Sequence, residues 1–594
     1  MDRSFTSLAF TPPAFTRALV AGCERVAAWA DLLDEINVFP VADGDTGRNL
    51  KISLGPLGGA NGLPSVLSQA LIQSATGNSG NIAAAFFCRF LSEAVSGGMR
   101  PSLIAGRDAA WHAVADPKPG TMLTLFDALV QATEKWPARV LRHDVDAIVE
   151  NLDGAVRSTV ELLPELKRAG VVDAGALGMF IFFEGFFYRL ESETADMVPV
   201  TERFAGLLDV TGDIVGGQFP GYCVNTIIRA TDSAKLAPGT SGLGESVVAV
   251  ADGDRFRLHL HTPNQQAARS RLETLGEIVD WQVEPMDARG AIRFSRSGGK
   301  SVHVMTDAAG SITREEARAL GITLLDSRLV VDDRSSPETL FDAPQMYRAM
   351  SAGQRVSTAQ ASVFQKHQSY QSALGRHDNV LYLTVGSVYT GNFATASRWR
   401  ETRGMTDRFM VMDTGAASGR LGLIARMVAR FARSGEPLKV VAAYARKAID
   451  SCGELIFLDQ LKFLAAGGRI SKSKGFFGDL LGIKPVISPT ADGAARVGTV
   501  RKSADQLPFA LAYLKQRFSP DRRLTILLQF SDNEQRVQEA IQPEIQLQFP
   551  QAAITVSRLS LTAGAHMGPG TWGVAFCPDL DGNDIEENNQ EDHL

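Results

Sequence analysis

Two aspartates, Asp43 and Asp45, flank a single glycine shortly after Asn37, and this spacing of carboxylates points to metal chemistry. Hard divalent cations take oxygen ligands, and magnesium in phosphoryl-transfer sites is held by one or two carboxylates plus substrate phosphates. Gly44 permits backbone angles that let both acids turn toward one point, and Thr46 can add a hydroxyl or an N–H. A plain surface turn is the alternative, because Asp and Gly dominate turns for local reasons alone.

Three further glycine-containing turns follow in the first 190 residues, each beside a helical stretch: Gly77–Gly80, Gly120–Leu123 and Val171–Gly175. The set resembles the nucleotide-binding domain of the dihydroxyacetone kinases. It is more similar to the kinase domain of bacterial fatty acid kinase, whose hallmark is NVFPV-x-DGDTG followed by GNSG. The resemblance spans roughly residues 10–190 and implies that Asp43 and Asp45 hold magnesium on the phosphates of ATP. It gives Thr46 a catalytic role, and it gives nucleotide-lining roles to Asn37, Asn78, Ser79, Gly80, Thr121 and Asp173.

Composition and length set limits on the function. A chain of 594 residues is too long for one core and indicates about three or four domains. The formal net charge of −6 argues against non-specific nucleic-acid binding. Five scattered cysteines and a start without a secretory pattern favour the cytoplasm. The most apolar run, Met179–Tyr188, is too short to span a bilayer and contains Glu184, so we expect a buried helix end.

Apolar residues recur at three- and four-residue intervals in the first third of the chain, which predicts helices. The predicted helices cover Ala14–Leu33, Pro64–Gln73, Ile82–Val95, Leu103–Ala115, Leu123–Lys135, Val145–Lys167 and Ala176–Leu190. We therefore expect residues 1–200 to form an all-α domain whose loops at one end bind metal and nucleotide. This agrees with the helical barrel of the resembled family.

Residues 201–298 predict a small α+β domain, with strands over Gly221–Arg229, Ser246–Val250 and Arg255–His261. His259 and His261 are two apart on a strand and point to the same face. With Cys223 on a neighbouring strand they form a set of the type that binds zinc, although ordinary hydrogen-bonded histidines are the alternative. The run HLHTPN resembles the H-x-H-T-ND motif of the fatty acid kinase middle domain, where a Cys and two His bind zinc.

The C-terminal half alternates strands and helices after a linker at Ser297–Lys300, for example over Val302–Asp307, Glu315–Leu320, Val380–Val385, Phe409–Met412 and Ala443–Cys452. This alternation predicts α/β layers with parallel strands in a domain of residues 299–580. The acidic remainder, residues 581–594, predicts a disordered tail.

Four polar loops of this half carry hydroxyls, one arginine and one histidine, which suit an anion: Val356–Ser362, Gly386–Asn392, Gly467–Ile470 and Gly564–Gly570. Each alone is typical of a helix cap. Together with Ile483–Pro485 they resemble the DegV family of fatty-acid-binding proteins, over residues 301 to about 577. The resemblance implies two lobes with an acyl tunnel between them. It also implies that the carboxylate of the acid contacts Thr358, Ser387, Arg469 and His566.

This sequence departs from the DegV patterns at several positions. Ala308 follows Asp307 where the family has serine, Ala359 and Ala361 alter the STSQPS loop, and Gly386 replaces the first serine of ISS. The anion site therefore has fewer hydroxyls than the family pattern, so the family's selectivity for the acid does not carry over to this chain.

The two resemblances together predict a fused kinase and fatty-acid carrier that phosphorylates a fatty acid carboxylate with ATP and magnesium. The product would be an acyl phosphate for phospholipid synthesis, which implies an acyltransferase as a partner and transient contact with a membrane surface. The alternatives are a small polyol or ketone kinase with a lipid-sensing domain, and a non-catalytic fatty-acid carrier. The sequence leaves open whether carrier and kinase meet within one chain or across a homodimer.

Overall fold

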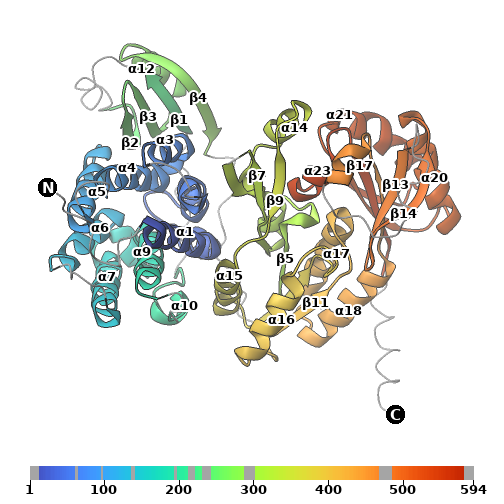
Figure 1. Cartoon of the computed structure of the whole chain (residues 1–594), viewed down its shortest axis with the longest axis horizontal. Coiled ribbons are helices and arrows are strands. Elements are labelled where there is room, and N and C mark those ends of the chain that lie inside the picture. Colours follow the sequence, from blue (N-terminus) through green and yellow to red (C-terminus); the bar gives the residue numbers. More distant parts are fainter. Residues whose placement is uncertain are drawn as a thin grey trace. The chain divides into compact units, whose positions relative to one another are not determined.

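The computed structural model describes residues 12–59, 64–94, 98–135, 141–192, 197–211, 221–229, 242–286, 302–332, 334–466 and 484–580. The chain forms two compact units, Met1–Arg296 and Ser297–Leu594 (Figure 1).

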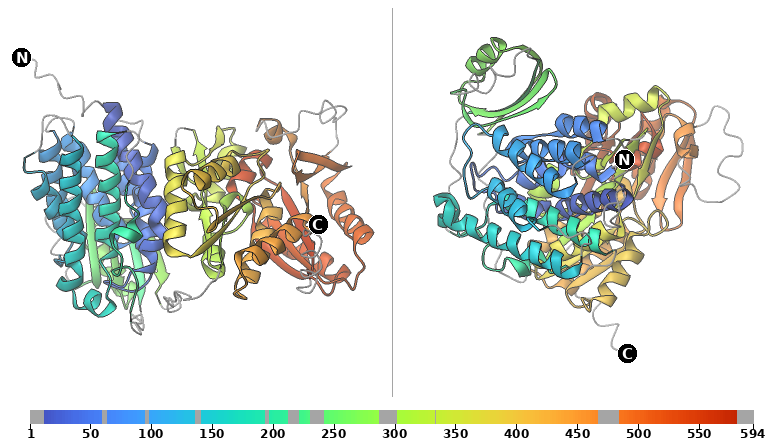
Figure 2. Two further views of the ribbon diagram at one scale, coloured as in Figure 1. Left: turned by 90° about the horizontal axis from the view of Figure 1, so that it is seen from below. Right: turned by 60° about the vertical axis from the view of Figure 1, so that its left-hand side comes forward.

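The first unit begins as a helical bundle of α1 (Pro12–Glu35), α2 (Thr46–Ser53), α3 (Pro64–Ser74), α4 (Gly77–Ala94), α5 (Met99–Ala113), α6 (Met122–Ala132), α7 (Arg142–Leu162), α8 (Pro164–Ala169), α9 (Ala174–Glu191) and α10 (Val200–Arg203). Its long helices run side by side in both views of Figure 2. The seven predicted helices are present. The predicted Val145–Lys167 helix is two helices, because Pro164 cannot donate a hydrogen bond and instead starts α8.

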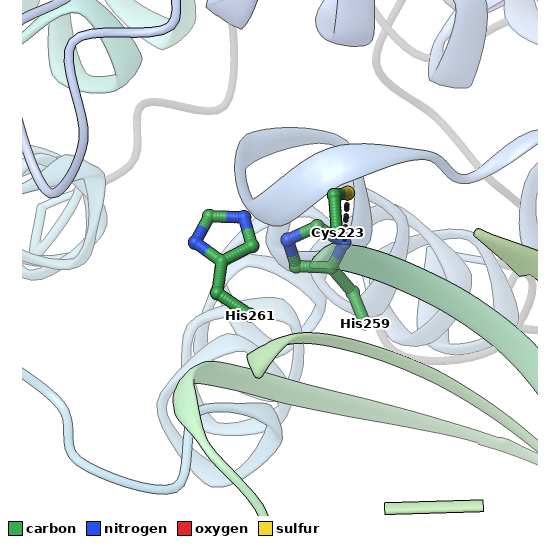
Figure 3. Close-up of side chains that lie close together, drawn as sticks. All are labelled: Cys223, His259 and His261. Carbon is green, nitrogen blue, oxygen red and sulfur yellow. Dashed lines mark hydrogen bonds between the residues drawn. The ribbon is translucent and has the colours of Figure 1, made fainter. Parts of the chain in front are cut away.

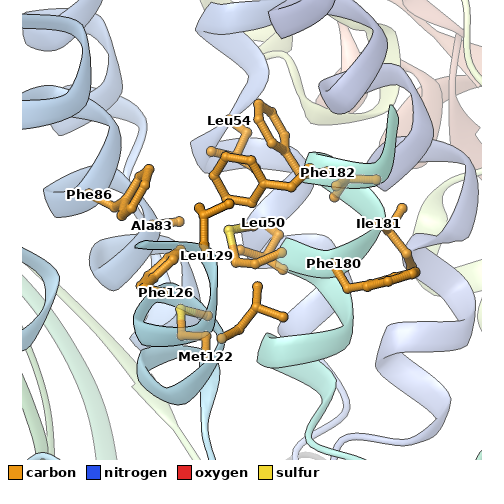
Figure 4. Packing of buried hydrophobic residues seen from close by; sticks show 14 of the residues in the cluster. Leu50, Leu54, Ala83, Phe86, Met122, Phe126, Leu129, Phe180, Ile181 and Phe182 are labelled. Atoms are coloured by element: carbon orange, nitrogen blue, oxygen red, sulfur yellow. The ribbon is translucent and has the colours of Figure 1, made fainter. Parts of the chain in front are cut away.

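Helix α9 is the centre of the bundle, and every residue from Ala174 to Tyr188 is buried. Phe180 and Phe182 belong to one hydrophobic core with side chains of the surrounding helices, including Leu50 of α2 and Phe86 of α4 (Figure 4). Burying one such side chain contributes about 1.5–3 kcal/mol. The apolar run at Met179–Tyr188 is therefore an interior helix. Within the described residues, no helix is long and apolar enough to cross a membrane.

The buried carboxylate of this apolar helix, Glu184, is neutralised from two sides. Glu184 of α9 accepts a hydrogen bond from Arg25 of α1, and both side chains are almost completely buried. The other carboxylate oxygen of Glu184 lies 3.3 Å from Nη2 of Arg203 in α10. The charged groups thus join three helices at the core, where a lone charge would be costly.

A four-stranded antiparallel sheet completes the first unit, in the order β2-β3-β1-β4, and its strands are β1 (Tyr222–Arg229), β2 (Glu245–Asp252), β3 (Arg255–Thr262) and β4 (Glu277–Pro285). One face is covered by α12 (Gln265–Glu273), through Leu258 and Leu260. The other face lies on the helical bundle: Arg257 donates to the carbonyl oxygen of Gln73 at 3.0 Å, and Val248 joins the core of the bundle.

The second unit contains β5 (Val302–Asp307), α13 (Arg314–Leu320), β6 (Ile322–Leu325), β7 (Arg328–Val331), β8 (Arg334–Pro337), α14 (Ala343–Ser351), β9 (Val356–Ala359), α15 (Val363–Arg376), β10 (Asn379–Thr384), α16 (Asn392–Thr402), β11 (Phe409–Asp413), α17 (Ser418–Ala432), α18 (Leu438–Ser451), β12 (Gly453–Phe457), α19 (Leu461–Ala466), β13 (Lys484–Thr490), β14 (Gly493–Val500), α20 (Gln506–Arg517), β15 (Leu524–Phe530), α21 (Glu534–Arg536), α22 (Gln542–Gln548), β16 (Ala553–Arg558), α23 (Leu561–Met567) and β17 (Trp572–Pro578).

The first lobe of this unit is a parallel sheet in the order β11-β10-β5-β6. Leu381 and Leu383 of β10 pack on the side of α17 and α18, whereas Tyr382 packs on the side of α15 and α16. A strand that helices cover on both faces is apolar at nearly every position. The continuous apolar runs in the sequence therefore predicted a buried parallel sheet.

The second lobe is a six-stranded sheet in the order β14-β13-β12-β17-β15-β16. Here the prediction of parallel strands is wrong for most of the sheet, because only β15 and β16 pair in parallel among the described strands. Only two residues connect β13 to β14, and a connection that short allows only antiparallel pairing. Helix α17 contacts both sheets and shares one hydrophobic core with them.

A small third sheet, in the order β8-β7-β9, lies beside α14 and α23. Of the segments that the alternation singled out, Val380–Val385 covers most of β10 and Phe409–Met412 lies within β11. Ala443–Cys452 is the end of α18 with its C-cap residue Cys452.

Replacing Glu184 by alanine leaves the buried Arg25 and the partly buried Arg203 without their shared carboxylate, so we expect a loss of about 3–5 kcal/mol of stability. At about 2–4 °C per kcal/mol, a loss of 3 kcal/mol lowers the first unit's calorimetric transition by roughly 6–12 °C. The matched control is Glu161→Ala, which removes an exposed ion pair to Lys167 and should cost less than about 1 kcal/mol. Equal shifts for the two variants would contradict a structural role for the buried cluster.

Candidate functional site

The acidic loop joins α1 to α2 and places Asp45 immediately before α2 begins. Gly44 has a φ of 61°, a left-handed conformation that residues with a Cβ rarely adopt. Asp43 and Asp45 are both half-buried on either side of this turn. Asp43 and Asp45 therefore lie on either side of one tight turn, directly before a helix begins.

Asn37 fixes the shape of this loop. Its amide oxygen accepts hydrogen bonds from the backbone N of Asp45 at 3.3 Å, from the backbone N of Thr46 at 3.1 Å and from Thr46 Oγ1 at 2.7 Å. Its Nδ2 donates to the carbonyl oxygen of Val41 at 3.1 Å, and Asn49 Nδ2 donates to Asp45 Oδ1 at 2.8 Å. Asn37 and Thr46 thus stabilise the conformation of the acidic loop through hydrogen bonds.

The GNSG run begins α4 and lies directly against α2. Gly77 has a φ of 63°, and a Cβ there would lie 1.9 Å from Asn49 Nδ2, so a side chain would block the approach of the two helices. Asn78 Oδ1 and Ser79 Oγ are buried without a hydrogen-bond partner in the described part of the chain. Buried polar atoms normally have a partner, so these two atoms fit a polar ligand at the start of α4, beside the buried Gly80.

Thr121 and Asp173 are the N-cap residues of α6 and α9. Thr121 Oγ1 accepts from the backbone N of Leu123 at 3.4 Å, and Asp173 Oδ1 accepts from the backbone N of Ala176 at 2.7 Å. Such bonds satisfy N–H groups that a helix leaves open at its first turn. Local capping alone therefore explains both residue types, in addition to any contact with a nucleotide.

The starts of four helices gather at one end of the bundle. Helix α4 meets α2 at Gly77, and α9 meets α2 where a Cβ on Gly178 would lie 2.4 Å from Leu50 Cδ1. Helix α9 meets α6 where a Cβ on Gly175 would lie 2.8 Å from Met122 Cε. Helix N-termini carry partial positive charge and open N–H groups, and both features favour phosphate.

The charges at this end match magnesium and phosphate. Burial raises the pKa of Asp173 to about 7, against the opposing hydrogen bonds from the backbone N–H groups of Ala176 and Gly175. A carboxyl group that is half-protonated near neutral pH repels phosphate less than an ionised one. Within the described residues no third acidic, histidine or cysteine ligand atom joins Asp43 and Asp45 in a metal-sized group. The residues present fit a magnesium ion that takes its remaining ligands from phosphate and water.

A separate cluster of ligand atoms lies on the sheet of the first unit. Cys223, His259 and His261 bring one ligand atom each to within 4.8 Å of one another (Figure 3). Cys223 pairs with His261 across β1 and β3, and its Sγ lies 3.9 Å from His259 Nδ1. His259 Nδ1 also lies 3.1 Å from Asn225 Oδ1.

The triad points to the face of the sheet that lies on the helical bundle. His259 and His261 are 1% and 4% exposed, and they alternate with Leu258 and Leu260, which pack beneath α12. Ligand atoms on a tetrahedral zinc with bonds of about 2.0–2.3 Å lie about 3.3–3.8 Å apart. The triad is slightly wider than this and can close on an ion by small rotations of its side chains.

The second unit contains a cavity of about 110 Å³ between its lobes. Its polar wall includes Thr358 of β9 and His566 of α23, whose Oγ1 and Nε2 lie 3.1 Å apart. Its apolar wall includes Ile456, Ile487 and Met567. A cavity with one polar and one apolar wall suits an amphiphile.

Ser387, another predicted head-group residue, lies away from this cavity. Ser387 is exposed, its backbone N donates to Asp413 Oδ1 at 3.0 Å, and it does not line the cavity. Thr390 of the same loop does line it. Arg469 lies outside the described residues.

Sequence reasoning missed a buried carboxylate in the cavity wall. Asp307 accepts hydrogen bonds from Tyr382 Oη at 2.6 Å, from Asn392 Nδ2 at 2.8 Å and from the backbone N of Val385 at 2.7 Å. Burial raises the pKa of Asp307 to about 6, although these bonds favour the charged form. The available signal was the polar Thr306–Asp307 pair at the end of an otherwise apolar strand.

Curated relatives match about half of this chain. An uncharacterized protein of Staphylococcus saprophyticus is 28% identical over 327 residues, which is 48% of this chain and 58% of that protein. Protein YloV of Bacillus subtilis is 29% identical over 311 residues, which is 46% of this chain and 55% of that protein. The chain therefore spans just over half the length of the curated relatives that it matches.

Solved structures similar to this chain include a DegV family protein from Thermus thermophilus, described by its fatty acid binding. It is 21% identical with a TM-score of 0.44, and the match covers 47% of this chain and 100% of that chain. DegV from Bacillus subtilis, described as a fatty acid binding protein, is 19% identical with a TM-score of 0.44 and the same coverage of both chains.

Three family models match successive parts of the chain. The DAK2 domain matches residues 40–188, which contain the acidic loop and the gathered helix starts. The FakA-like middle domain of fatty acid kinase matches residues 219–291, which contain the Cys/His/His triad. The DegV family matches residues 301–579, which contain the cavity. The chain thus joins a DAK2 domain, a FakA-like middle domain and a DegV-family domain in one polypeptide.

Proposed function

We propose that this protein binds a fatty acid in its DegV-family domain and transfers the γ-phosphoryl group of ATP to the acid's carboxylate. One observation carries the proposal. The same chain holds an acidic loop among gathered helix N-termini and, in its second unit, a cavity with a polar wall and an apolar wall. The order of the three matched domains supports the same combination of kinase and lipid binding.

The residues of the helical bundle would bind and orient the nucleotide. Asp43 and Asp45 would hold magnesium against the phosphates, with Asn37 and Thr46 keeping the loop in shape. The unpaired oxygen of Asn78 and the N–H groups at the helix starts would bind polar atoms of the nucleotide. Bound magnesium-ATP would supply the phosphoryl group and neutralise its charge during transfer.

The acid would need no general base, because a carboxylate is already ionised at pH 7. One carboxylate oxygen bonds to the γ-phosphorus while the bond from that phosphorus to the bridging oxygen of ADP breaks. The products are an acyl phosphate and ADP. Thr358 and His566 would hold the other carboxylate oxygen, and Arg469 would add a cation. An acyltransferase that accepts acyl phosphates would then consume the product.

The cavity volume bears on the length of the acid. An apolar cavity of about 150 Å³ holds one benzene molecule, so about 110 Å³ accommodates the head group and only the first carbons. A long acid must therefore push apart the flexible side chains of the apolar wall, such as Met567 and Leu464. Each further buried methylene then contributes about 0.8 kcal/mol.

A fatty-acid carrier without kinase activity is the second candidate. The observation that favours it is the cavity itself, whose polar and apolar walls suit an amphiphile without any part of the helical bundle. The two candidates differ in one product: only a kinase consumes ATP and forms an acyl phosphate, which hydroxylamine traps as a hydroxamate.

Asp43→Asn and Asp45→Asn should each abolish hydroxamate formation from ATP and fatty acid, because each removes a carboxylate from the magnesium site. Binding of the fatty acid should be unchanged, since the cavity lies in the other unit. The control is Asp108→Asn, a half-exposed aspartate of α5, which should keep full activity. Undiminished turnover in both loop variants would remove the magnesium assignment, and absence of turnover in the unaltered protein would favour the carrier.

His566→Ala and Arg469→Ala should weaken fatty-acid binding and stop acyl-phosphate formation while leaving magnesium-ATP binding intact, because a buried carboxylate needs compensating partners. Mixing Arg469→Ala chains with Asp43→Ala chains then tests how the domains cooperate. Recovered activity means that the carrier of one chain serves the kinase of another, and continued inactivity means transfer within one chain. Normal binding and phosphorylation by both single variants would refute the head-group assignment.

The purified protein should contain about one zinc ion per chain, and Cys223→Ser should lower that content, because three convergent Cys and His side chains suit zinc. Metal analysis by mass spectrometry measures both. The matched control is Cys452→Ser, a buried cysteine of the second unit, which should leave the zinc content unchanged. A folded and active protein without zinc would assign the triad to ordinary hydrogen bonding.

A further inference from the structure

Lys366 is a buried lysine in the first half of α15 and is only 3% exposed. Lysine is almost never fully buried unless its charge is paired. In the second unit this lysine interacts with two residues that line the cavity, Gln360 and Asp307. These two partners indicate why a positive charge is buried there.

Lys366 makes contact with the cavity wall through Gln360. Its Nζ donates a hydrogen bond to Gln360 Oε1 at 2.8 Å, and Gln360 lines the cavity. An ammonium group has only donors, so the amide atom that faces it must be the oxygen. The amide Nε2 of Gln360 is therefore the end of this side chain that remains available to donate to a ligand.

Lys366 also interacts with the carboxylate of the cavity wall. The charge of Lys366 lowers the pKa of Asp307, and the charge of Asp307 raises the pKa of Lys366 against the effect of burial. Among the described lining residues Asp307 is the one acid, and His566 is the one residue with a basic side chain. A fatty acid carboxylate entering this cavity would meet a like charge unless a cation balanced it.

We propose that Lys366 is a positioning residue that makes the cavity accept a carboxylate rather than a neutral head group. It balances the charge of Asp307 and holds the Gln360 amide with its N–H groups available to the ligand. This inference rests on the proposed binding of a fatty acid in the same cavity, and it adds a residue that determines which ionic form of a lipid is bound.

The experiment compares two lipids that differ only in head group, palmitate and hexadecanol, by titration calorimetry with the full chain at about pH 8, where Asp307 is ionised. Lys366→Met should weaken palmitate binding about tenfold or more and leave hexadecanol binding within about twofold, a tenfold change being about 1.4 kcal/mol. Lys366→Arg should retain palmitate binding, because it keeps the charge and the donors. The control, Lys439→Met on the exposed surface of α18, should bind both lipids normally.

Two further variants guard against an effect on folding alone. Lys366→Met with Asp307→Asn removes both charges and should recover most of the lost palmitate affinity. Gln360→Ala alters an exposed side chain at the cavity and should weaken palmitate binding more than hexadecanol binding. Equal losses for both lipids in Lys366→Met, or unchanged palmitate binding, would overturn the inference. If the unaltered protein binds neither lipid, the proposed function itself fails; if it binds palmitate and Lys366→Met does too, only the role of Lys366 fails.

Discussion

The close packing of helices around α9 is the constraint on which the nucleotide end of the first unit depends. Helix α9 approaches α2 at Gly178 and α6 at Gly175. A Cβ on either glycine would collide with a side chain of the neighbouring helix, so the close approach depends on glycine at both contacts. The same contacts bring the starts of α2, α4, α6 and α9 to one end of the bundle. An apolar core that excludes water from α9 thus also determines where the N–H groups and acids gather, and one packing solution serves both stability and binding.

The sheet of the middle domain depends on the same bundle. Its strand β3 is buried on both faces: one face lies under α12 and the other on the helices. Because successive side chains alternate between faces, His259 and His261 both lie against the bundle. A bound metal at this triad would brace the sheet next to the helices, which makes a structural role for the ion more natural there than a catalytic one.

The periodicity of apolar residues predicted the long helices well, because each buries one continuous stripe against the core. It missed α2, whose eight residues are mostly small or polar and derive their burial from the close approach to α1 and α4. The alternation of strands and helices also predicted parallel strands for the second lobe, where most strands are antiparallel. Strand direction depends on the connections between strands, which apolar runs do not encode. The residue types and the spacing along the strands were enough to predict that Cys223, His259 and His261 lie close together. Ser387, chosen by resemblance, is exposed, because a loop motif does not determine which of its residues points inward.

The pairing of Asp307 with Lys366 escaped detection for a further physical reason. Asp307 stands in a family pattern that gives it no charged partner, Lys366 belongs to no motif, and their interaction arises only in the folded chain. A buried acid is stable only when donors and a cation compensate its charge. In the cavity this compensation comes from Tyr382, Asn392 and Lys366, whereas Glu184 in the helical core is held directly by arginines. The difference lies in access. Arg25 and Glu184 are buried in a closed core, whereas Asp307 lines a cavity that a ligand can enter. The charge of a ligand in the cavity therefore adds to the charges of Asp307 and Lys366. Both charge clusters are buried, but only the cluster of Asp307 and Lys366 lies where a ligand can contact it. Access to a ligand therefore distinguishes a charge cluster that can select what binds from one that only stabilises the fold.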